Sequence, residues 1–134
     1  FEVINYDDVV SECGGAEWSQ IQEELKVGNN MTRPTRKAAI KGAKECEVKF
    51  FAFATLDQQI STVAADGSIK TTVQITAQVW NISKRLPRKV ASVNIPNMGG
   101  FGRNDEEAYL DALRRGSVKA ATRIVDQLNL KGLK

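Results

Sequence analysis

The chain has 134 residues, of which 42% are hydrophobic and 26% are charged, and its formal net charge is +3. These values are ordinary for a globular protein, and the length suffices for one domain with its own core. A transmembrane segment is not expected, because no run approaches the roughly 18 apolar residues of a membrane span. We therefore expect a single domain over residues 1–134.

The charges are unevenly distributed along the chain. Residues 1–31 carry seven acids and one lysine, a net charge of −6, so the remaining residues carry +9. Such asymmetry occurs on surfaces that bind nucleic acids or membranes, and also where two solvated faces of one fold differ in sign. Nucleic-acid binding is disfavoured here, because the stacking aromatics and recognition motifs that accompany it are missing.

The first 46 residues predict one strand and two helices. Phe1–Val10 reads as a short strand, although paired acids in its second half are unfavourable there. Apolar residues recur at helical spacing over Ala16–Lys26, before a Gly-Asn-Asn stop. A second helix is expected over residues 34–46, because Pro34 suits a first helical turn.

The second of these helices carries a stripe of lysines, Lys37, Lys41 and Lys44, at helical spacing. The stripe is either a solvated helix face or a site for an anion or an acidic partner. The solvated face is the simpler interpretation.

Two cysteines, Cys13 and Cys46, permit one disulfide. Such a bridge contributes roughly 3–4 kcal/mol by restricting the unfolded chain, and it suits an exported protein. The alternative is two unpaired thiols, one of them buried. A zinc site is not expected, because the chain has no histidine and two thiols fall short of four ligands.

Three consecutive strands are predicted after the second cysteine, over Val48–Val63, Ser68–Ser83 and Arg88–Ile95. The middle one is the clearest, because β-branched and small residues alternate strictly with polar ones along it. Asp66-Gly67 between the first two strands predicts a tight hairpin turn.

A turn centred on Asp66-Gly67 places residue 54 opposite residue 79 and assigns each side chain to a face. The core face then holds Val48, Phe50, Ala52, Ala54, Leu56, Ile75, Ala77 and Val79. Ala91, Val93 and Ile95 of the third strand join it if the loop before that strand has an odd number of residues. The second face holds Phe51, Phe53, Trp80 and Ile82. A slip of one residue would exchange the two sets.

A glycine-rich stretch, Asn97–Arg103, is expected to connect the sheet to a long helix from about Asp105 to Leu130. Its glycines match neither the dinucleotide fingerprint nor the P-loop. Asn104 suits an N-cap, and Glu107 has the spacing of a capping box. The predicted buried stripe of this helix is Tyr109, Leu113, Ala120, Ile124 and Leu128, broadened by Ala112, Gly116, Ser117, Ala121 and Val125.

No catalytic constellation follows from the sequence. Without histidine, Ser-His and Cys-His pairs are excluded. The acids cluster at helix starts and in the N-terminal segment, where capping and solubility explain them, and no metal-ligand spacing is present. We expect a non-enzymatic protein without a cofactor, a metal or a small-molecule substrate.

Two features predict a protein partner, with a homo-oligomer as one possibility. The first is the aromatic set Phe51, Phe53 and Trp80, which either forms an exposed apolar patch or is covered by the helix expected over Ala16–Lys26. The second is a basic turn, which is either a solvated loop or a surface that steers an acidic partner or an anionic lipid. The basic turn consists of Lys84, Arg85, Arg88 and Lys89.

The pattern between Thr32 and Lys134 resembles a known family. Lys41-Gly42-Ala43-Lys44-Glu45 runs into Val48-Lys49-Phe50-Phe51-Ala52, a long Asp66-Gly67 hairpin follows with Val73–Asn81 as its returning strand, and Gly99-Gly100-Phe101-Gly102 precedes an alanine-rich terminal helix. Together these resemble the TolB-N-terminal-like α/β domains of bacterial envelope proteins, which include curli-secretion lipoproteins, lipoprotein activators of penicillin-binding proteins and flagellar T-ring proteins. The basic loop at residues 83–87 departs from the acid-containing Thr-Gly turn of that family.

The expected fold is α/β (α+β), with an antiparallel or mixed sheet built on a three-strand meander and packed by two to three helices, including a long C-terminal one. The resemblance implies a periplasmic or envelope-associated domain that takes part in a ring, a secretion complex or the activation of a partner. The alternative function is a nucleic-acid-binding module that uses Lys37, Lys41, Lys44, Lys84, Arg85, Arg88 and Lys89.

Overall fold

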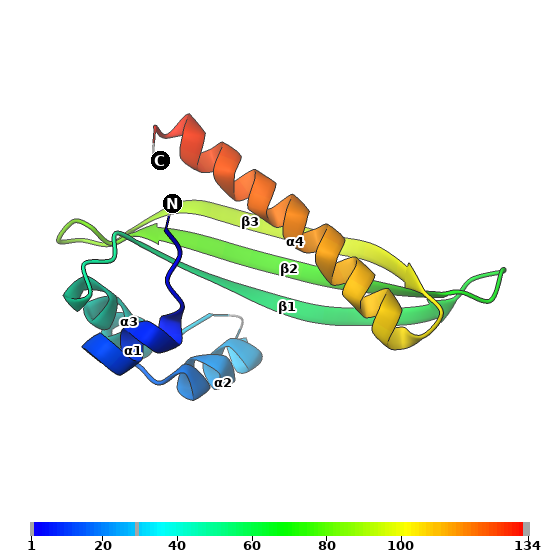
Figure 1. The fold of residues 1–134 in the computed structure, drawn as a ribbon, viewed down its shortest axis with the longest axis horizontal. Coiled ribbons are helices and arrows are strands. Elements are labelled where there is room, and N and C mark those ends of the chain that lie inside the picture. The colour runs from blue at the N-terminus through cyan, green and yellow to red at the C-terminus, as the bar shows by residue number, and fades with distance from the viewer. Residues whose placement is uncertain (1, 29, 133–134) are drawn as a thin grey trace. The chain divides into compact units, whose positions relative to one another are not determined.

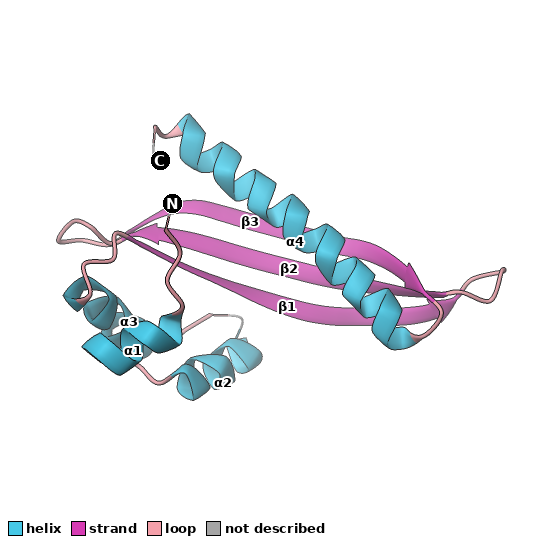
Figure 2. Cartoon of the chain, viewed as in Figure 1, coloured by secondary structure: helices cyan, strands magenta, loops and turns pink. Residues whose placement is uncertain are grey.

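The computed structural model describes residues 2–28 and 30–132, and over these it has four helices and one antiparallel sheet of order β1-β2-β3 (Figures 1 and 2). The elements are α1 (Tyr6–Cys13), α2 (Trp18–Gly28), α3 (Arg33–Glu45), β1 (Phe50–Val63), β2 (Ile69–Asn81), β3 (Arg88–Gly102) and α4 (Asp105–Leu130). The predicted fold class, a meander packed by helices with a long one at the C-terminal end, is confirmed.

The chain forms two compact units. The first comprises Phe1–Ala52 and Trp80–Lys89, and the second comprises Phe53–Val79 and Val90–Lys134. All three strands contribute residues to both units, because the boundaries fall within β1, β2 and β3. No described helix is long and apolar enough to cross a membrane.

The predicted N-terminal strand is wrong, because the described part of Phe1–Val10 is extended chain followed by helix α1, while Phe1 itself lies outside the described residues. Asp7 and Asp8 lie in the first helical turn, where carboxylates interact favourably with the positive end of the helix dipole. Val9 is buried in a cluster with Ile40 of α3. The paired acids that are unfavourable in a strand therefore stabilise a helix start.

The next two helices agree with the prediction to within two residues. Helix α2 covers Trp18–Gly28, and α3 begins at Arg33 with Pro34 in its first turn. Glu24 of α2 accepts hydrogen bonds from the Thr32 backbone N–H (2.7 Å) and from the Thr35 hydroxyl, which ties the end of α2 to the start of α3. Hydrogen bonding from the side chains of Thr32 and Thr35, with a smaller contribution from the Thr32 N–H, lowers the pKa of the Glu24 carboxyl.

The hairpin between β1 and β2 differs by one residue from the predicted register. The Ala64 N–H donates to the Ser68 carbonyl (2.8 Å), the Gly67 N–H donates to the Ala64 carbonyl (2.9 Å), and Gly67 has a φ of 87°. A three-residue loop with glycine in the left-handed region therefore closes the hairpin. Ser61 faces Thr71, with the two hydroxyl oxygens 2.9 Å apart, whereas the prediction pairs residue 61 with residue 72.

At the far end of the hairpin the Ile82 N–H donates to the Lys49 carbonyl (2.9 Å), a pairing two residues from the predicted one, so the β1 side chains there keep their predicted faces. Leu56 packs against the core of the second unit as predicted. Ala52 and Ala54, predicted on the core face, are nevertheless exposed, and Phe53 is half-buried. The core face of β2 is as predicted, with Ile75, Ala77 and Val79 all buried. Ala91, Val93 and Ile95 of β3 are buried as predicted.

The core of the second unit lies between α4 and the sheet (Figure 1). Its buried residues are Val73, Ile75, Val93, Ile95, Ala112 and Ala120, with Leu56, Met98, Tyr109 and Ile124 packed against them. The predicted stripe of α4 is too broad, because Ser117, Ala121 and Val125 are exposed. The buried positions Ala108, Ala112, Gly116 and Ala120 follow each other at four-residue intervals, so small side chains line the contact.

The glycine-rich stretch Asn97–Arg103 is not a connection, because β3 continues through it to Gly102. A Cβ at Gly100 would lie 2.1 Å from the backbone nitrogen of Ala112, so glycine is what allows α4 to approach the strand. Asn104 caps α4 as predicted, accepting from the Glu107 N–H (2.9 Å). The Glu107 carboxylate accepts from the backbone N–H of Arg103 (2.9 Å), one residue before the position of a standard capping box.

Candidate partner-binding surface

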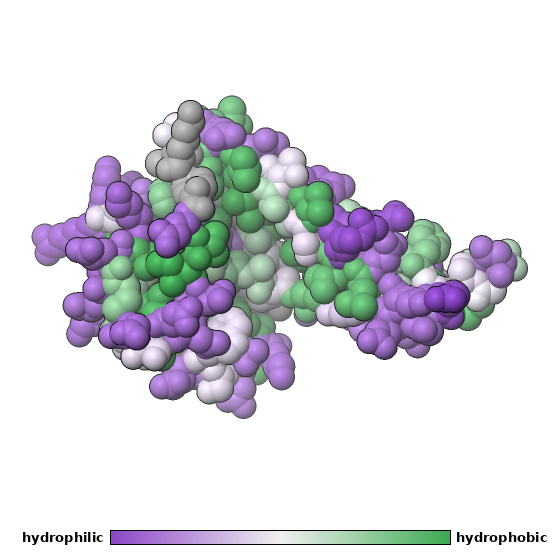
Figure 3. All heavy atoms as spheres, in the orientation of Figure 1, coloured by the Kyte–Doolittle hydropathy of each residue, from purple (hydrophilic) through white to green (hydrophobic). Residues whose placement is uncertain are grey.

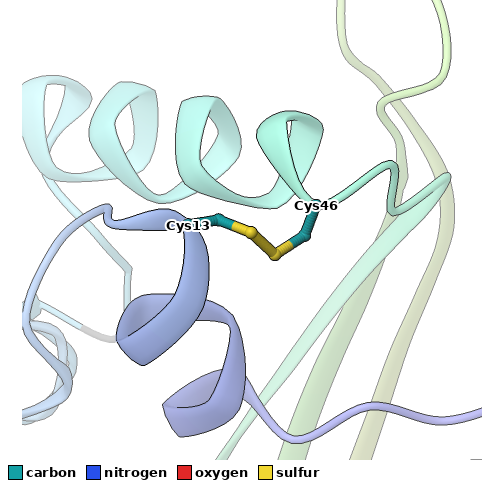
Figure 4. Close-up of a disulfide and its surroundings, with 2 residues drawn as sticks. All are labelled: Cys13 and Cys46. Atoms are coloured by element: carbon teal, nitrogen blue, oxygen red, sulfur yellow. A yellow bond between two sulfur atoms is a disulfide. The ribbon is translucent and has the colours of Figure 1, made fainter.

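A disulfide between Cys13 and Cys46 joins the ends of α1 and α3 in the first unit (Figure 4). The Cα atoms are 5.7 Å apart, within the normal range for such a bridge. The two helices touch closely beside it, since a Cβ at Gly42 of α3 would lie 2.1 Å from the carbonyl oxygen of Gly14. Of the two alternatives that the sequence leaves open, a bridge or two unpaired thiols, the structure has the bridge.

Beneath this helix pair lies an apolar cluster that contains two of the three predicted partner-binding aromatics. The cluster buries Val9, Ile40, Ala43 and Ile82, and Cys46, Val48, Phe51 and Trp80 pack against it. Phe51 and Trp80 are thus half-buried and packed against residues of α1 and α3. Phe53 belongs to the second unit and lies outside this cluster.

Tyr6 of α1 connects the cluster to α2. Its ring lies 5.8 Å from that of Phe51 in an edge-on arrangement and 6.1 Å from that of Trp18. Its hydroxyl donates to the Ala16 carbonyl at 2.6 Å, and burial raises the pKa of the Tyr6 phenol. Trp18 therefore reaches the cluster through Tyr6.

Two cations lie on Trp80. The guanidinium carbon of Arg36 in α3 is 5.2 Å from the ring centroid, and the ammonium nitrogen of Lys89 in β3 is 6.0 Å from it. Both distances suit cation–π attraction, which is worth about 0.5–1 kcal/mol at an exposed site. The tryptophan therefore gathers positive charge from a helix and from the start of a strand.

The loop between β2 and β3 is held to α3 by a lysine. Lys44 donates from its ammonium to the backbone carbonyls of Lys84 (2.9 Å) and Arg85 (3.3 Å). At the other side of the loop, Asn81 accepts from the backbone N–H and hydroxyl of Ser83 at 3.0 and 2.6 Å. These contacts fix the backbone while the side chains of Lys84 and Arg85 remain exposed, and Figure 3 shows the loop as a hydrophilic protrusion.

These residues define a surface that we name the Trp80 basic surface. It consists of Trp80 with Arg36, Lys44, Lys84, Arg85, Arg88 and Lys89. Within residues 2–28 and 30–132, none of the six cations forms an ion pair with an acid. Cations of one sign gathered on one surface attract anionic partners over several ångströms.

The structure brings together only part of the predicted basic residues. Lys44 contacts the loop, but in the described chain no hydrogen bond or ion pair joins Lys37 or Lys41 to it. Arg36 was missed by sequence reasoning. A signal for it exists, because Arg36 and Lys44 lie four residues on either side of the buried Ile40 and so share its helix face.

The described residues contain no group of three or more His, Cys, Asp or Glu side chains placed to hold a metal ion. A surface hollow of about 400 Å³ is lined by Asn5, Tyr6, Asp7, Asp8 and Trp18. The Tyr6 hydroxyl is already engaged by the Ala16 carbonyl. These residues carry no nucleophile paired with a base.

Comparison with protein-family models, with curated proteins and with solved structures finds no match. The resemblance to TolB-N-terminal-like domains therefore depends on the sequence pattern and stays a prediction.

Proposed function

We propose that this chain is a non-enzymatic protein-interaction domain of a bacterial envelope assembly, and that the Trp80 basic surface binds an acidic segment of its protein partner. The observation that carries the proposal is the pair of cations on Trp80, Arg36 and Lys89, together with the basic loop that Lys44 holds to α3. No acid is paired to any cation of the surface among residues 2–28 and 30–132. Charge complementarity of this kind raises the association rate and selects the partner.

The disulfide supports the periplasmic part of the proposal. Bridges such as Cys13–Cys46 persist in oxidising compartments, which include the bacterial periplasm. Since the bridge ties α1 to α3, and α3 supplies Arg36 and Lys44, oxidation also stabilises the helix that presents the surface.

A protein partner suits the surface better than a single-stranded nucleic acid. Base stacking needs an aromatic face that is open to the base. Trp80 is half-buried against the apolar cluster, and Arg36 and Lys89 lie over its ring. The cations around it remain accessible to carboxylates.

The proposal is tested with a double charge reversal, Lys84→Glu with Arg85→Glu, at the exposed tip of the loop. The matched control is Lys26→Glu with Lys119→Glu, which changes the net charge equally at exposed positions outside the surface. The probes are a fluorescent glutamate-rich peptide and a single-stranded oligonucleotide of similar length, measured by anisotropy at two salt concentrations. We expect the tip variant to weaken peptide binding at least about tenfold, which is about 1.4 kcal/mol, and the control to change it little.

Two results would overturn the proposal. Equal losses in the tip variant and the control would show attraction by net charge alone. Tighter binding of the oligonucleotide than of the peptide, with a steep salt dependence, would favour the nucleic-acid alternative.

A further inference from the structure

The two edges of the sheet in the second unit differ. Strand β1 lies at one edge, because the strand order is β1-β2-β3. Its last seven residues, 57–63, are all exposed, and they include Ile60 (64% exposed) and Val63 (71%). This segment, Asp-Gln-Gln-Ile-Ser-Thr-Val, has one charge, no lysine and no proline, so it lacks the devices that usually protect a strand edge.

The hairpin register shows which backbone groups face outward on this edge. The Ala64 N–H donates to the Ser68 carbonyl, so residue 64 points toward β2. Backbone groups alternate along a strand, which places residues 62, 60 and 58 toward β2 as well. Asp57, Gln59, Ser61 and Val63 therefore turn their N–H and carbonyl groups away from β2, on the side where the sheet has no further strand.

The other edge is closed by side chains of α4. Gln127 both donates to the Ser92 carbonyl and accepts from the Ser92 N–H, each at 2.9 Å, as a neighbouring strand would. Lys131 donates to the Val90 carbonyl (2.6 Å), and Arg123 donates to the Asn94 carbonyl (3.4 Å). The three helical residues are spaced by four and the strand residues by two, so α4 side chains bind the carbonyls of three alternate residues of β3.

We propose that residues 57–63 of β1 pair antiparallel with the same segment of a second copy of this chain and form a closed dimer. The proposal is independent of the Trp80 basic surface. It depends on the difference between the β3 edge, whose backbone is bound by side chains of α4, and the exposed β1 edge at residues 57–63.

The segment is complementary to itself in one register. With Ile60 opposite Ile60 of the second copy, Gln59 lies opposite Ser61 and Asp57 opposite Val63. The outward-facing backbone groups then meet each other, and the two exposed isoleucines cover each other. Asp57 is the one charged residue of each segment, and the two copies of it lie at opposite ends of the paired strands. Like charges are therefore not opposite each other.

This pairing forms a dimer that does not add further chains. It is isologous, because each copy uses the same patch. Once the two β1 segments have met, the β3 edge of each second unit remains, and there Lys131, Gln127 and Arg123 already bind the backbone of residues 90, 92 and 94. A closed dimer is therefore expected, and fibres are not.

The register is tested by cross-linking with Ile60→Cys. Residues opposite each other at the two-fold axis form a non-hydrogen-bonded pair with Cα atoms about 4.5 Å apart, within reach of a disulfide. The control is Val118→Cys on α4, which is 62% exposed, close to the 64% of Ile60. Mild oxidation should give a covalent dimer for Ile60→Cys and little for Val118→Cys.

The role of the edge itself is tested with Gln59→Pro against Gln59→Ala. Proline removes an outward N–H and breaks no bond to β2, whereas alanine keeps the N–H. Sedimentation of the wild-type chain should show a monomer–dimer equilibrium. Gln59→Pro should weaken it about tenfold or more, with Gln59→Ala close to wild type and all three folded by circular dichroism.

Three results would overturn the inference. They are a wild-type chain that stays monomeric at its highest attainable concentration, equal cross-linking of the two cysteine variants, and an unchanged dimer in Gln59→Pro.

Discussion

The two units of this chain are stabilised in different ways. In the first, short helices enclose a cluster around Ile40 and Ile82 and are joined by the Cys13–Cys46 bridge. In the second, one long helix lies so close to the sheet that a Cβ at Gly100 would meet the backbone of α4. One unit combines a covalent link with a small core, and the other depends on close fit over a long contact.

This difference separates two kinds of sensitivity. A disulfide acts mainly by restricting the unfolded chain, so the unit that contains it should respond to reduction. Close packing leaves no room for an added methyl group, so the other unit should respond to small increases in side-chain volume. The Trp80 basic surface belongs to the first unit, which makes the redox state relevant to its geometry.

The largest expected effect is that of removing the bridge. In Cys13→Ser with Cys46→Ser, the loss of a cross-link over a separation of 33 residues should cost roughly 3–4 kcal/mol of unfolding free energy. Hydrogen exchange should accelerate in α1 and α3 and change little in α4. Urea unfolding and exchange mass spectrometry measure the two effects.

Reduced wild-type chain is the control for this variant and should match it. Equal loss of protection in α1 and α4 would contradict the comparison, because it would show that the two units unfold as one.

The next largest effect concerns the close packing of α4 on β3 in the second unit, and it is tested at two adjacent glycines, Gly99 and Gly100. Gly100→Ala should cost about 2–3 kcal/mol, because the new methyl group would meet the backbone nitrogen of Ala112. Gly99→Ala is the matched control, since its Cβ would lie 3.1 Å from the flexible side chain of Lys70, which can move. Urea midpoints of the two variants give the comparison, and similar losses in both would show that contact with the α4 backbone is not limiting.

Much of the second unit could be predicted because local signals and tertiary packing agree there. The alternation along β2 and the cap at Asn104 both follow from properties of a few neighbouring residues. The glycines after Asn97 were misinterpreted because they look like a connection. Their reason is the close approach of α4, which is a long-range contact that local pattern does not show.

The first unit was harder to predict because its decisive contacts join distant residues. The β-branched residues near the N-terminus predict a strand, yet Asp7 and Asp8 favour a helix start and Val9 is buried with Ile40. In the second unit, the hairpin register could not be predicted either, because it depends on whether two or three residues form the loop, which Asp66-Gly67 alone does not decide.

Of the seven residues of the candidate surface, all but Arg36 could be named from the sequence. The cations of the loop could be listed as a basic turn, but their relation to Trp80 required the position of α3. Arg36 shows why. Two of the three lysines in the predicted stripe, Lys37 and Lys41, lie on the more exposed helix face, while the α3 cation that contacts Trp80 lies on the face of the buried Ile40.

The smallest expected effect is a dependence on acid pH that belongs to the second unit. Asp111 of α4 accepts from the Phe101 N–H (3.0 Å) at the end of β3, and it also pairs with Arg114 (2.9 Å) and Arg115 (3.1 Å). The backbone hydrogen bond, followed by the two arginines, lowers the pKa of Asp111 from its usual 3.8. A carboxyl whose pKa is lowered by folding stabilises the folded state at every pH above the pKa that it has in the unfolded chain. This contribution is lost as the pH falls through the pKa of the folded state.

In Asp111→Asn the melting temperature should therefore fall less steeply below about pH 4 than in the wild-type chain. Its dependence on pH near neutrality should not change. Asp126→Asn removes the same charge from the same helix and is the matched control for the change in net charge. Melting temperatures between pH 2 and 7 measure the difference. If Asp111→Asn kept the full acid slope, the hydrogen bond between Asp111 and Phe101 would not help to hold α4 against β3. The close packing of α4 on β3 at Gly100 would then have to hold the helix without it.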